Sequence, residues 1–323
     1  MNGTMRVGVV GLGAIGGWLA ARLALAGHDV TGFVRPERLS AGGIKLTADG
    51  RTSVAPVRLS ADPAARGAQD LLVLATKATT LAEAAEWATP LIGSDTLVLP
   101  LQNGVPYWFE KDAPLESVDP GGRIAAVLPA AQVIAGVVHA AARRPSPDEI
   151  VLVHADKLAL GEADGGSSDR VDRLVSTLAR AGVPAVADPD VRRALWYKLW
   201  GNCTLNPLSA LTRASCDRLL ADPELRAFIA EGMNDAAAVG AAIGCPIAES
   251  SDARMAVTAR LGPFKTSMLQ DLEAGRPLEL DALLGAPREL GRRYGVPTPA
   301  LDRLDALART LAKSLGLMPS CFR

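Results

Sequence analysis

A glycine-rich segment near the amino terminus has the spacing of a phosphate-binding turn. It joins a short β-rich run, residues 6–10, to residues of helix composition, 14–26, and reads Gly11-Leu12-Gly13-Ala14-Ile15-Gly16. In such a turn the first glycine allows the tight bend, the second lets the backbone approach a pyrophosphate, and the third lets helix and strand pack closely. N–H groups at the helix start can then bind phosphates. The segment predicts a dinucleotide site, and a glycine turn without a ligand is the alternative.

The residue after the second strand distinguishes the two nicotinamide dinucleotides. NAD-binding proteins usually carry Asp or Glu there, which accepts a hydrogen bond from the ribose 2′-hydroxyl. In this chain the strand at residues 30–34 is followed by Arg35, with Arg38 one turn further on. A guanidinium suits a 2′-phosphate through charge-assisted hydrogen bonds. The sequence therefore favours NADP (NADPH), the alternative being two solvated surface arginines.

Polar residues follow two further apolar runs of the same region. Thr76-Lys77 follow residues 71–75, and Gln102-Asn103-Gly104 follow residues 96–101. In open α/β sheets the reacting groups lie beyond the carboxyl ends of the strands. Lys77 and Asn103 are thus candidates for binding cofactor or substrate, although each could also be an ordinary exposed lysine or turn.

A polar stripe crosses an apolar segment in the second half of the chain. Lys198, Asn202 and Asn206 are spaced i, i+4, i+8, so they share one face of a helix, and Pro207 should end or kink that helix. Polar groups in so apolar a segment need polar partners or a wet cleft. A partly exposed helix face is the alternative.

Ketone reduction would explain that stripe. Hydride addition leaves negative charge on the carbonyl oxygen, which requires a proton donor. Histidine, the common proton donor, is sparse in this chain, which has only three, at positions 28, 139 and 154. A protonated lysine can both polarise the carbonyl and deliver the proton, and burial would lower the pKa of Lys198 toward the working range. The two asparagines could orient its ammonium without adding charge.

The elements that must position these groups divide the chain into two parts. Strands and helices alternate as far as residue 188, which predicts a parallel sheet covered on both faces. This part includes a hairpin over residues 44–59, an antiparallel pair at 150–153 and 157–160, and a last strand at 184–187. Helices alone follow, at residues 191–205, 223–243, 265–274, 280–293 and 299–315. The predicted fold class is α/β, with an N-terminal Rossmann-type doubly wound sheet, the NADP-binding domain 1–188, and an all-helical C-terminal domain, 189–323, for substrate and dimerisation.

Composition excludes several other classes of function. The 34 basic and 35 acidic residues give a net charge of −1, which argues against a broad nucleic-acid-binding face. Neither the four cysteines nor the three histidines have metal-ligand spacing, so no metal is expected. The apolar stretch 124–142 is interrupted by polar residues and proline, so no membrane span is expected. The first residues lack a signal-peptide pattern, which favours a cytoplasmic protein with a small-molecule substrate.

Taken together, the motifs resemble the ketopantoate reductases (2-dehydropantoate 2-reductases) through almost the whole chain. The resemblance rests on residues 11–17, Lys77, Asn103-Gly104, residues 195–199, Asn202-Cys203, Asn206-Pro207-Leu208, Ser267-Met268-Leu269-Gln270-Asp271 and Glu279-Leu280-Asp281. Two features depart from the family pattern. Leu284 stands where the family often has Asn before Gly285, and residues 110–135 form a longer segment than usual.

The resemblance implies a set of roles and partners. Lys198 would be the catalytic acid, and Glu279 would bind or orient the substrate. Substrate or cofactor contacts are implied for Asn103, Asn202, Asn206 and Ser267, and Lys77 would lie near the nicotinamide. It further implies NADPH, a 2-oxo acid substrate, a cytoplasmic homodimer, and a step of pantothenate and coenzyme A biosynthesis.

Two alternatives remain open. The first is a reductase of another 2-oxo or 3-oxo acid on the same scaffold, since the two departures leave the substrate undecided. The second is a non-catalytic NADPH-binding sensor. A sensor needs only the phosphate site, so the presence of both Lys198 and Glu279 argues against it.

Overall fold

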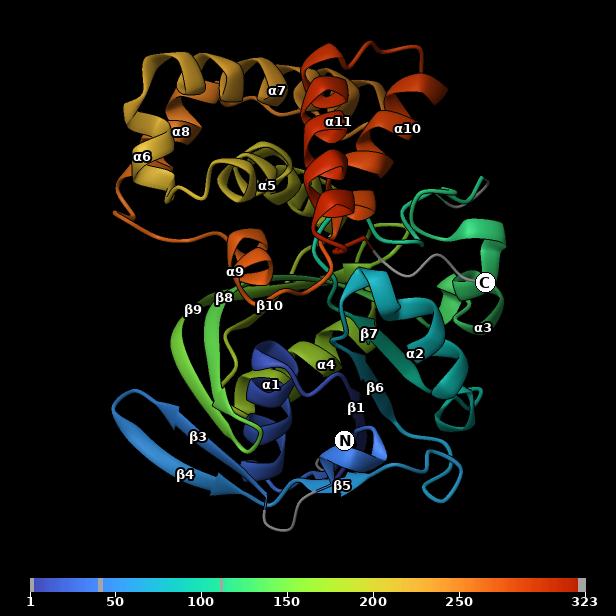
Figure 1. Ribbon diagram of the computed structural model, residues 1–323. Helices are drawn as coiled ribbons and strands as arrows, with labels where there is room; N and C mark the ends of the chain where they lie inside the picture. Colours follow the sequence, from blue (N-terminus) through green and yellow to red (C-terminus); the bar gives the residue numbers. More distant parts are fainter. Residues whose placement is uncertain (1–2, 40–42, 111–112, 319–323) are drawn as a thin grey trace. The chain divides into compact units, whose positions relative to one another are not determined.

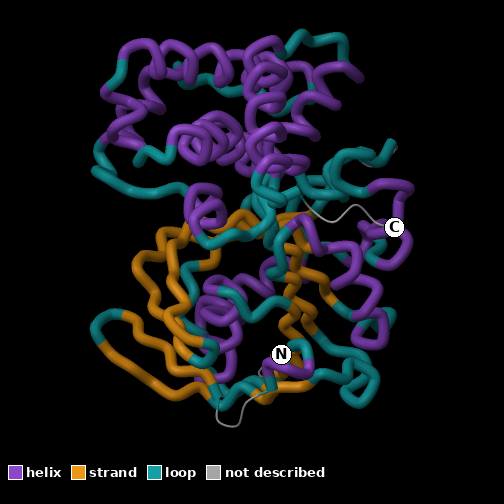
Figure 2. The backbone as a smooth tube through the Cα atoms, viewed as in Figure 1, coloured by secondary structure: helices purple, strands orange, loops and turns teal. Residues whose placement is uncertain are grey.

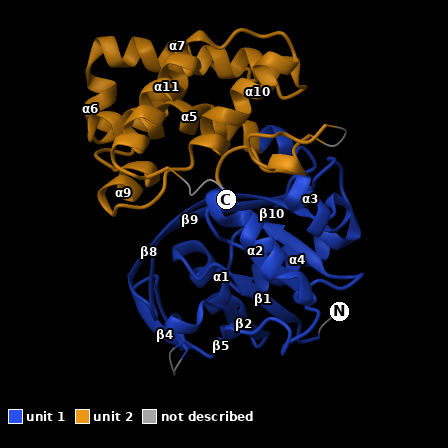
Figure 3. Cartoon of the chain, turned by 45° about the vertical axis from the view of Figure 1, so that its right-hand side comes forward, with its two compact units in different colours: residues 1–102, 122–194 blue, residues 103–121, 195–323 orange. Residues whose placement is uncertain are grey.

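The chain forms two compact units (Figure 3). The computed structural model describes residues 3–39, 43–110 and 113–318. The sheet unit comprises residues 1–102 and 122–194, and the helical unit comprises residues 103–121 and 195–323. This division differs from the expected one after residue 188 in two respects. It falls inside a helix, and it assigns residues 103–121 to the helical unit.

A parallel sheet forms the first layer of the sheet unit (Figure 1). Its strand order is β5-β2-β1-β6-β7, and the bounds are β1 Arg6–Val10, β2 Asp29–Phe33, β5 Arg58–Ser60, β6 Leu71–Leu74 and β7 Leu97–Pro100. Val7 pairs with Val30 on one side and with Leu71 on the other, and all three side chains are buried. Strands buried on both faces explain the continuous apolar runs of the sequence. The predicted fold class, a Rossmann-type sheet followed by a helical region, is confirmed.

A second, mixed sheet was not expected. It has the order β10-β9-β3-β4, with β8 paired to β9, and its strands are β3 Ile44–Ala48, β4 Arg51–Ala55, β8 Ile134–Ser146, β9 Glu149–Glu162 and β10 Ala185–Ala187. The antiparallel pair expected within residues 150–160 is wrong, because those residues form one strand, β9, whose antiparallel partner is β8. The hairpin expected over 44–59 is shorter. Its second arm ends at Ala55, before Pro56, and β5 joins the parallel sheet instead.

Helix α1, Ala14–Leu25, packs against strands of both sheets. A side chain at Gly17 would lie 2.7 Å from Ile150 of the second sheet, so this glycine permits the close contact. The other helices of the unit are α2 Leu81–Trp87, α3 Arg123–Val127 and α4 Asp169–Arg180, with short 3₁₀ turns at Pro36–Arg38, Ala78–Thr80, Thr89–Leu91, Pro120–Gly122 and Ala130–Gln132. Among the described residues, no helix has the length and apolar character to cross a membrane.

The described part of the helical unit contains helices and no strand (Figure 2). Its helices are α5 Val191–Thr212, which starts in the sheet unit, α6 Cys216–Ala221, α7 Pro223–Ala242, α8 Ser251–Ala259, α9 Ser267–Glu273, α10 Ala286–Arg293 and α11 Pro299–Ser314, with a π-helical turn at Asp281–Gly285. Two short helices, α6 and α8, escaped the sequence interpretation. Cys203, Cys216 and Cys245 are buried, and Cys321 lies outside the described residues.

Helix α5 continues through Pro207, so it does not end near Asn206, which was one of the two outcomes expected of this proline. Proline removes one backbone hydrogen bond, so packing must compensate. Two buried tryptophans in the earlier part of α5 bond this helix to α7. The indole N–H of Trp196 donates to Ala236 O of α7 at 3.0 Å, and that of Trp200 donates to Met233 O at 2.7 Å.

A close approach at β9 gives a test of the sheet unit. A methyl group on Gly161 would lie 2.3 Å from the carbonyl oxygen of Asp188, and backbone cannot move aside as a side chain can. We expect Gly161→Ala to lower the free energy of unfolding by about 1–3 kcal/mol, the usual cost of overpacking. Urea denaturation measures it. Ala141→Ser, on an exposed position of β8, is the control and should change stability by less than about 0.5 kcal/mol. Equal stability of Gly161→Ala and wild type would contradict this packing.

Candidate active site

The three glycines of the first turn each have a distinct structural reason. Gly11 has φ +94°, and a side chain there would lie 2.6 Å from the backbone of Ala75. A side chain on Gly16 would lie 2.1 Å from Gly11 O, so that glycine lets α1 approach β1. Above Gly13 the space is open for at least 4 Å. Gly11 and Gly16 build the turn, and Gly13 leaves room for a group to approach the backbone.

The amino end of α1 suits an anion. No side chain caps the helix, and its first turn holds no acidic residue. Ala14 and Ile15 begin the helix, while Leu12 is buried and packs against Gly32 of β2, so this segment can offer its backbone N–H groups to a ligand. The residues present therefore fit a dinucleotide pyrophosphate.

Arginines gather near the end of β2. Arg35 is exposed and precedes the 3₁₀ turn that contains Arg38. Burial, and after it the positive charge of Arg38, lowers the pKa of Arg144 on β8. Arg144 is thus close enough to Arg38 for their charges to interact. The sequence interpretation missed this third arginine because about a hundred residues separate it from the other two.

The carboxyl ends of β6 and β7 carry polar groups, as expected for a Rossmann-type sheet. Gln102 Nε2 donates to Leu74 O at 2.9 Å and to Thr76 O at 3.1 Å, which ties the two strand ends together. The hydroxyl of Thr76 and the amide oxygen of Gln102 are buried, and neither atom has a hydrogen-bond partner among the described residues. Buried polar atoms are normally paired, so these two atoms fit a site that a ligand completes. Lys77 is partly buried and directly precedes the next 3₁₀ turn.

In the helical unit the structure brings Lys198 and Asn103 together. The ammonium of Lys198 donates to Asn103 Oδ1 at 2.9 Å. The segment that carries Asn103 is held by the backbone, because Val105 N donates to Ala282 O at 2.9 Å. Next to Asn103, Gly104 has φ +88°, and a side chain there would lie 2.4 Å from the same carbonyl oxygen. The two predicted site residues are therefore fixed against each other.

Glu279 is the third member of this group. Its side chain is buried, and its negative charge acts on Lys198. Burial lowers the pKa of the Lys198 amine to about 8, and Glu279 opposes part of that shift by raising it. The amine therefore exchanges its proton near neutral pH, as a general acid must.

For the remaining candidate residues no described hydrogen bond to the group of Lys198, Asn103 and Glu279 is found. Asn202 is partly buried and Asn206 is buried, and both lie on α5, one and two turns beyond Lys198. Ser267 is the first residue of α9 and is exposed, while the side chain of Thr266 caps that helix. No described hydrogen bond joins Ser267 to Lys198. The glycine turn, Arg35 and Lys77 belong to the other unit of the chain, the sheet unit.

These features define the chain as a nicotinamide-dependent oxidoreductase with a Rossmann-type sheet and a helical unit that carries a lysine of lowered pKa. Two family models match it, "Ketopantoate reductase PanE/ApbA" over residues 7–165 and "Ketopantoate reductase PanE/ApbA C terminal" over residues 190–312. The chain belongs to the ketopantoate reductase family.

Individual relatives agree over nearly the full length. The 2-dehydropantoate 2-reductase of Mesorhizobium japonicum is 42% identical, and the match covers 97% of this chain and 99% of the relative. The crystal structure of a protein from Ralstonia solanacearum MolK2 superposes with a TM-score of 0.93 at 45% identity, covering 98% of this chain and 100% of that one. That of 2-dehydropantoate 2-reductase from Geobacter metallireducens GS-15 gives 0.84 at 28% identity, with coverage of 95% and 99%.

The environment of Lys198 gives a test that needs no substrate. In protein labelled with ¹³C at the lysine ε-carbons, the Lys198 signal should titrate near pH 8 rather than 10.5. Glu279→Gln should lower that pKa further, because the raising charge is removed. Lys198→Arg identifies the signal. Since the unfolded chain binds this proton more tightly, the contribution of Lys198 to stability should rise between pH 8 and 10.5. Titration near 10.5 in the folded protein would contradict the assignment.

Proposed function

We propose that the protein reduces 2-dehydropantoate to pantoate with NADPH, a step of pantothenate and coenzyme A biosynthesis, and that Lys198 donates the proton. The observation that carries the proposal is the bond from Lys198 to Asn103 Oδ1, 2.9 Å, in a group that also includes buried Glu279. Family membership supports the reaction class. The proposal includes a cytoplasmic homodimer, which rests on the family alone.

Lys198 performs the acid step. A bound NADPH supplies the hydride to the C2 carbon of the ketone. The ammonium of Lys198 hydrogen-bonds to the ketone oxygen, stabilises the negative charge that develops there, and transfers its proton to it. An ammonium has three N–H donors, so the bond to Asn103 alone does not use them up. The neutral amine then regains a proton from water, which a pKa of about 8 makes easy near neutral pH.

The other residues of the group orient the reactants. Asn103 accepts from the ammonium through an uncharged amide, so it directs the lysine without raising its pKa as a carboxylate would. Glu279 accepts a hydrogen bond from the hydroxyl at the far end of the substrate and thereby selects hydroxylated acids. We assign further substrate contacts to Asn202, Asn206 and Ser267.

The sheet unit holds the cofactor in this proposal. The backbone from Gly11 to Gly16 binds the pyrophosphate, and Arg35 binds the 2′-phosphate. Lys77 contacts the nicotinamide half. The open space above Gly13 and the uncapped start of α1 support the first of these assignments, and the exposed guanidinium of Arg35 supports the second.

A reductase of a different 2-oxo acid is the second candidate. It is favoured by Leu284, a fully buried leucine at the position where the family often has asparagine. An apolar side chain there changes the surroundings of the turn that follows Glu279. The two candidates share the acid step and differ in the substrate.

The cofactor preference should depend on Arg35. Wild type should bind NADPH more tightly than NADH by about 1.5–3 kcal/mol, the worth of a hydrogen bond to a charged group. Arg35→Ala should remove most of that difference, as measured by fluorescence titration with both cofactors. Arg51→Ala, another exposed arginine of the sheet unit, should leave it intact. Equal affinity of the wild type for both cofactors would refute the NADP assignment.

Substrate and mechanism are tested together by following NADPH oxidation with a panel of 2-oxo acids. Wild type should prefer 2-dehydropantoate to 2-oxoisovalerate by about 10²-fold or more in kcat/KM, because the second acid lacks the hydroxyl that would donate to Glu279. Lys198→Ala should lower kcat by about 10²–10⁴ without weakening NADPH binding, and the wild-type kcat should decline above pH 8 as the amine loses its proton.

Three outcomes would count against parts of the proposal. Equal use of both acids moves the second candidate ahead. A preference that survives in Glu279→Ala removes that residue from substrate selection. A folded Lys198→Ala variant with wild-type kcat, checked by circular dichroism, removes Lys198 from the mechanism.

A further inference from the structure

A π-helical turn follows the candidate substrate residue Glu279. It spans Asp281–Gly285 and leads directly into α10. The sequence predicted a regular helix from residue 280. Single π turns are rare, and they frequently occur at functional sites, where they change the direction of a helix and of the side chains beside it. Such a turn is less stable than an α-helix, so something must hold it in place.

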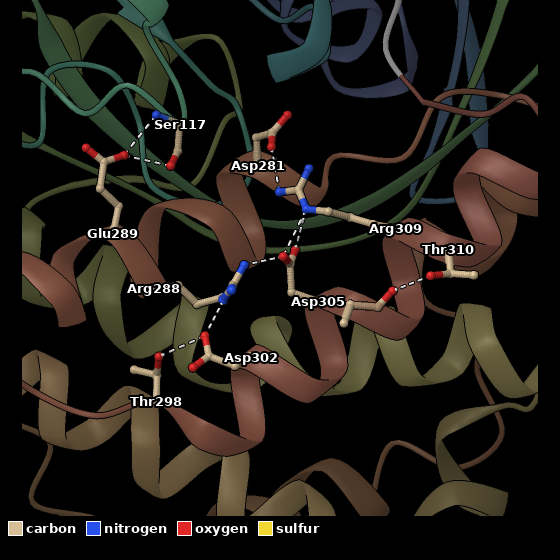
Figure 4. Close-up of polar contacts among 10 residues, drawn as sticks. Ser117, Asp281, Arg288, Glu289, Thr298, Asp302, Asp305, Arg309 and Thr310 are labelled. Carbon is tan, nitrogen blue, oxygen red and sulfur yellow. Dashed lines mark hydrogen bonds and ion pairs between the residues drawn. The ribbon is translucent and has the colours of Figure 1, made fainter.

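The turn is held by a chain of ion pairs that joins α11 to the turn itself and to α10 (Figure 4). Arg309 Nη2 donates to Asp281 Oδ1 at 2.7 Å, and Arg309 Nε lies 2.9 Å from both oxygens of Asp305. Arg288 donates to Asp305 and to Asp302, the latter at 2.5 Å. Because the side chain of Asp305 is only 4% exposed, its carboxylate depends on both guanidinium groups. The bonds to Asp305 therefore fix the guanidinium of Arg309 in the position from which it also binds Asp281.

The same turn contacts both ends of the segment that carries Asn103. At one end Ala282 O accepts from Val105 N at 2.9 Å. At the other, Ser117 Cβ lies 3.4 Å from the position of a side chain on Gly285, which itself lies beside Arg309 and Asp281. The hydroxyl and backbone N–H of Ser117 donate to Glu289 of α10 at 2.6 and 2.8 Å. A shift of the turn would therefore displace this segment.

We propose that Arg309 is a positioning residue of the active site: through Asp281 it fixes the π-helical turn, and the turn fixes both Glu279 and the Asn103 segment against Lys198. Glu279 precedes Asp281 by two residues, and Asn103 precedes Val105 by two, so only one residue separates each from a held residue. The catalytic consequence rests on the proposed function. The structural link does not, and it can be measured in the absence of substrate.

The first measurement is amide hydrogen exchange at Val105, resolved by NMR, in Arg309→Met and in Asp281→Asn. The second variant keeps Arg309 paired with Asp305, so it is the milder change and should fold if the first does not. Both variants should exchange the Val105 amide about tenfold faster or more, because its acceptor Ala282 O is no longer held. Arg303→Met is the control, since this arginine of α11 makes an exposed pair with Glu231, and it should leave the exchange rate unchanged.

The second measurement is kinetic and uses whichever 2-oxo acid the wild type reduces best. Arg309→Met and Asp281→Asn should lower kcat by about tenfold, since small displacements of positioned groups are costly, and should leave NADPH affinity within about twofold. In a Glu279→Ala background the same changes should cost less, because one of the two groups through which they act is already removed. A purely structural role would lower the melting temperature equally in both backgrounds and give additive losses of kcat.

The outcomes separate the two proposals. Unchanged Val105 exchange in both variants overturns the positioning role, whatever the protein reduces. Faster exchange with additive kinetic losses overturns the route through Glu279. If the wild type reduced no acid of the panel, the proposed function would fail, and exchange at Val105 would still decide whether Arg309 holds the turn.

Discussion

The cost of keeping a lysine amine away from water is the constraint on which the candidate site depends. An ammonium loses hydration when it is buried, and the resulting fall in the pKa of Lys198 is what makes its proton transferable near neutral pH. The positive charge of the ammonium must still be stabilised in part, because otherwise the amine would carry no proton near neutral pH. Asn103 provides a neutral acceptor, and Glu279 a negative charge. Burial lowers the pKa of the amine and Glu279 opposes part of that shift, so the pKa lies at about 8.

The packing around α5 follows from the same constraint. A lysine can be held in an apolar region only if its helix cannot rotate to expose it. The indoles of Trp196 and Trp200 are fully buried and bonded to the backbone of α7, and the ring of Phe109 lies 5.9 Å from that of Trp196. These contacts fix the rotation of α5 about its axis. They also bond the part of α5 that precedes Pro207 to the neighbouring helix, which stabilises a helix that lacks one backbone bond at the proline.

The sequence was sufficient where local rules decide the structure. The glycine turn, the strands beside it and the stripe that contains Lys198 follow from spacing and hydrophobic pattern, and the structure contains each of them. It was insufficient where distant residues decide. The second sheet depends on pairing between β8 and β9, which the alternation of polar and apolar residues does not specify. The π turn depends on Arg309, which is 28 residues beyond Asp281. The segment of Asn103 is joined to the helical unit by a backbone bond from Val105 N to Ala282 O, and no sequence pattern indicates such a bond.

Gln102 and Asn103 are consecutive residues whose side chains are bonded to different units of the chain. Gln102 ties the strand ends of the sheet unit, and Asn103 accepts from Lys198 of the helical unit. Each side chain is therefore held within its own unit, and the chain passes from one unit to the other between these two residues. Adjacency in the sequence therefore places these two side chains in separate parts of the fold.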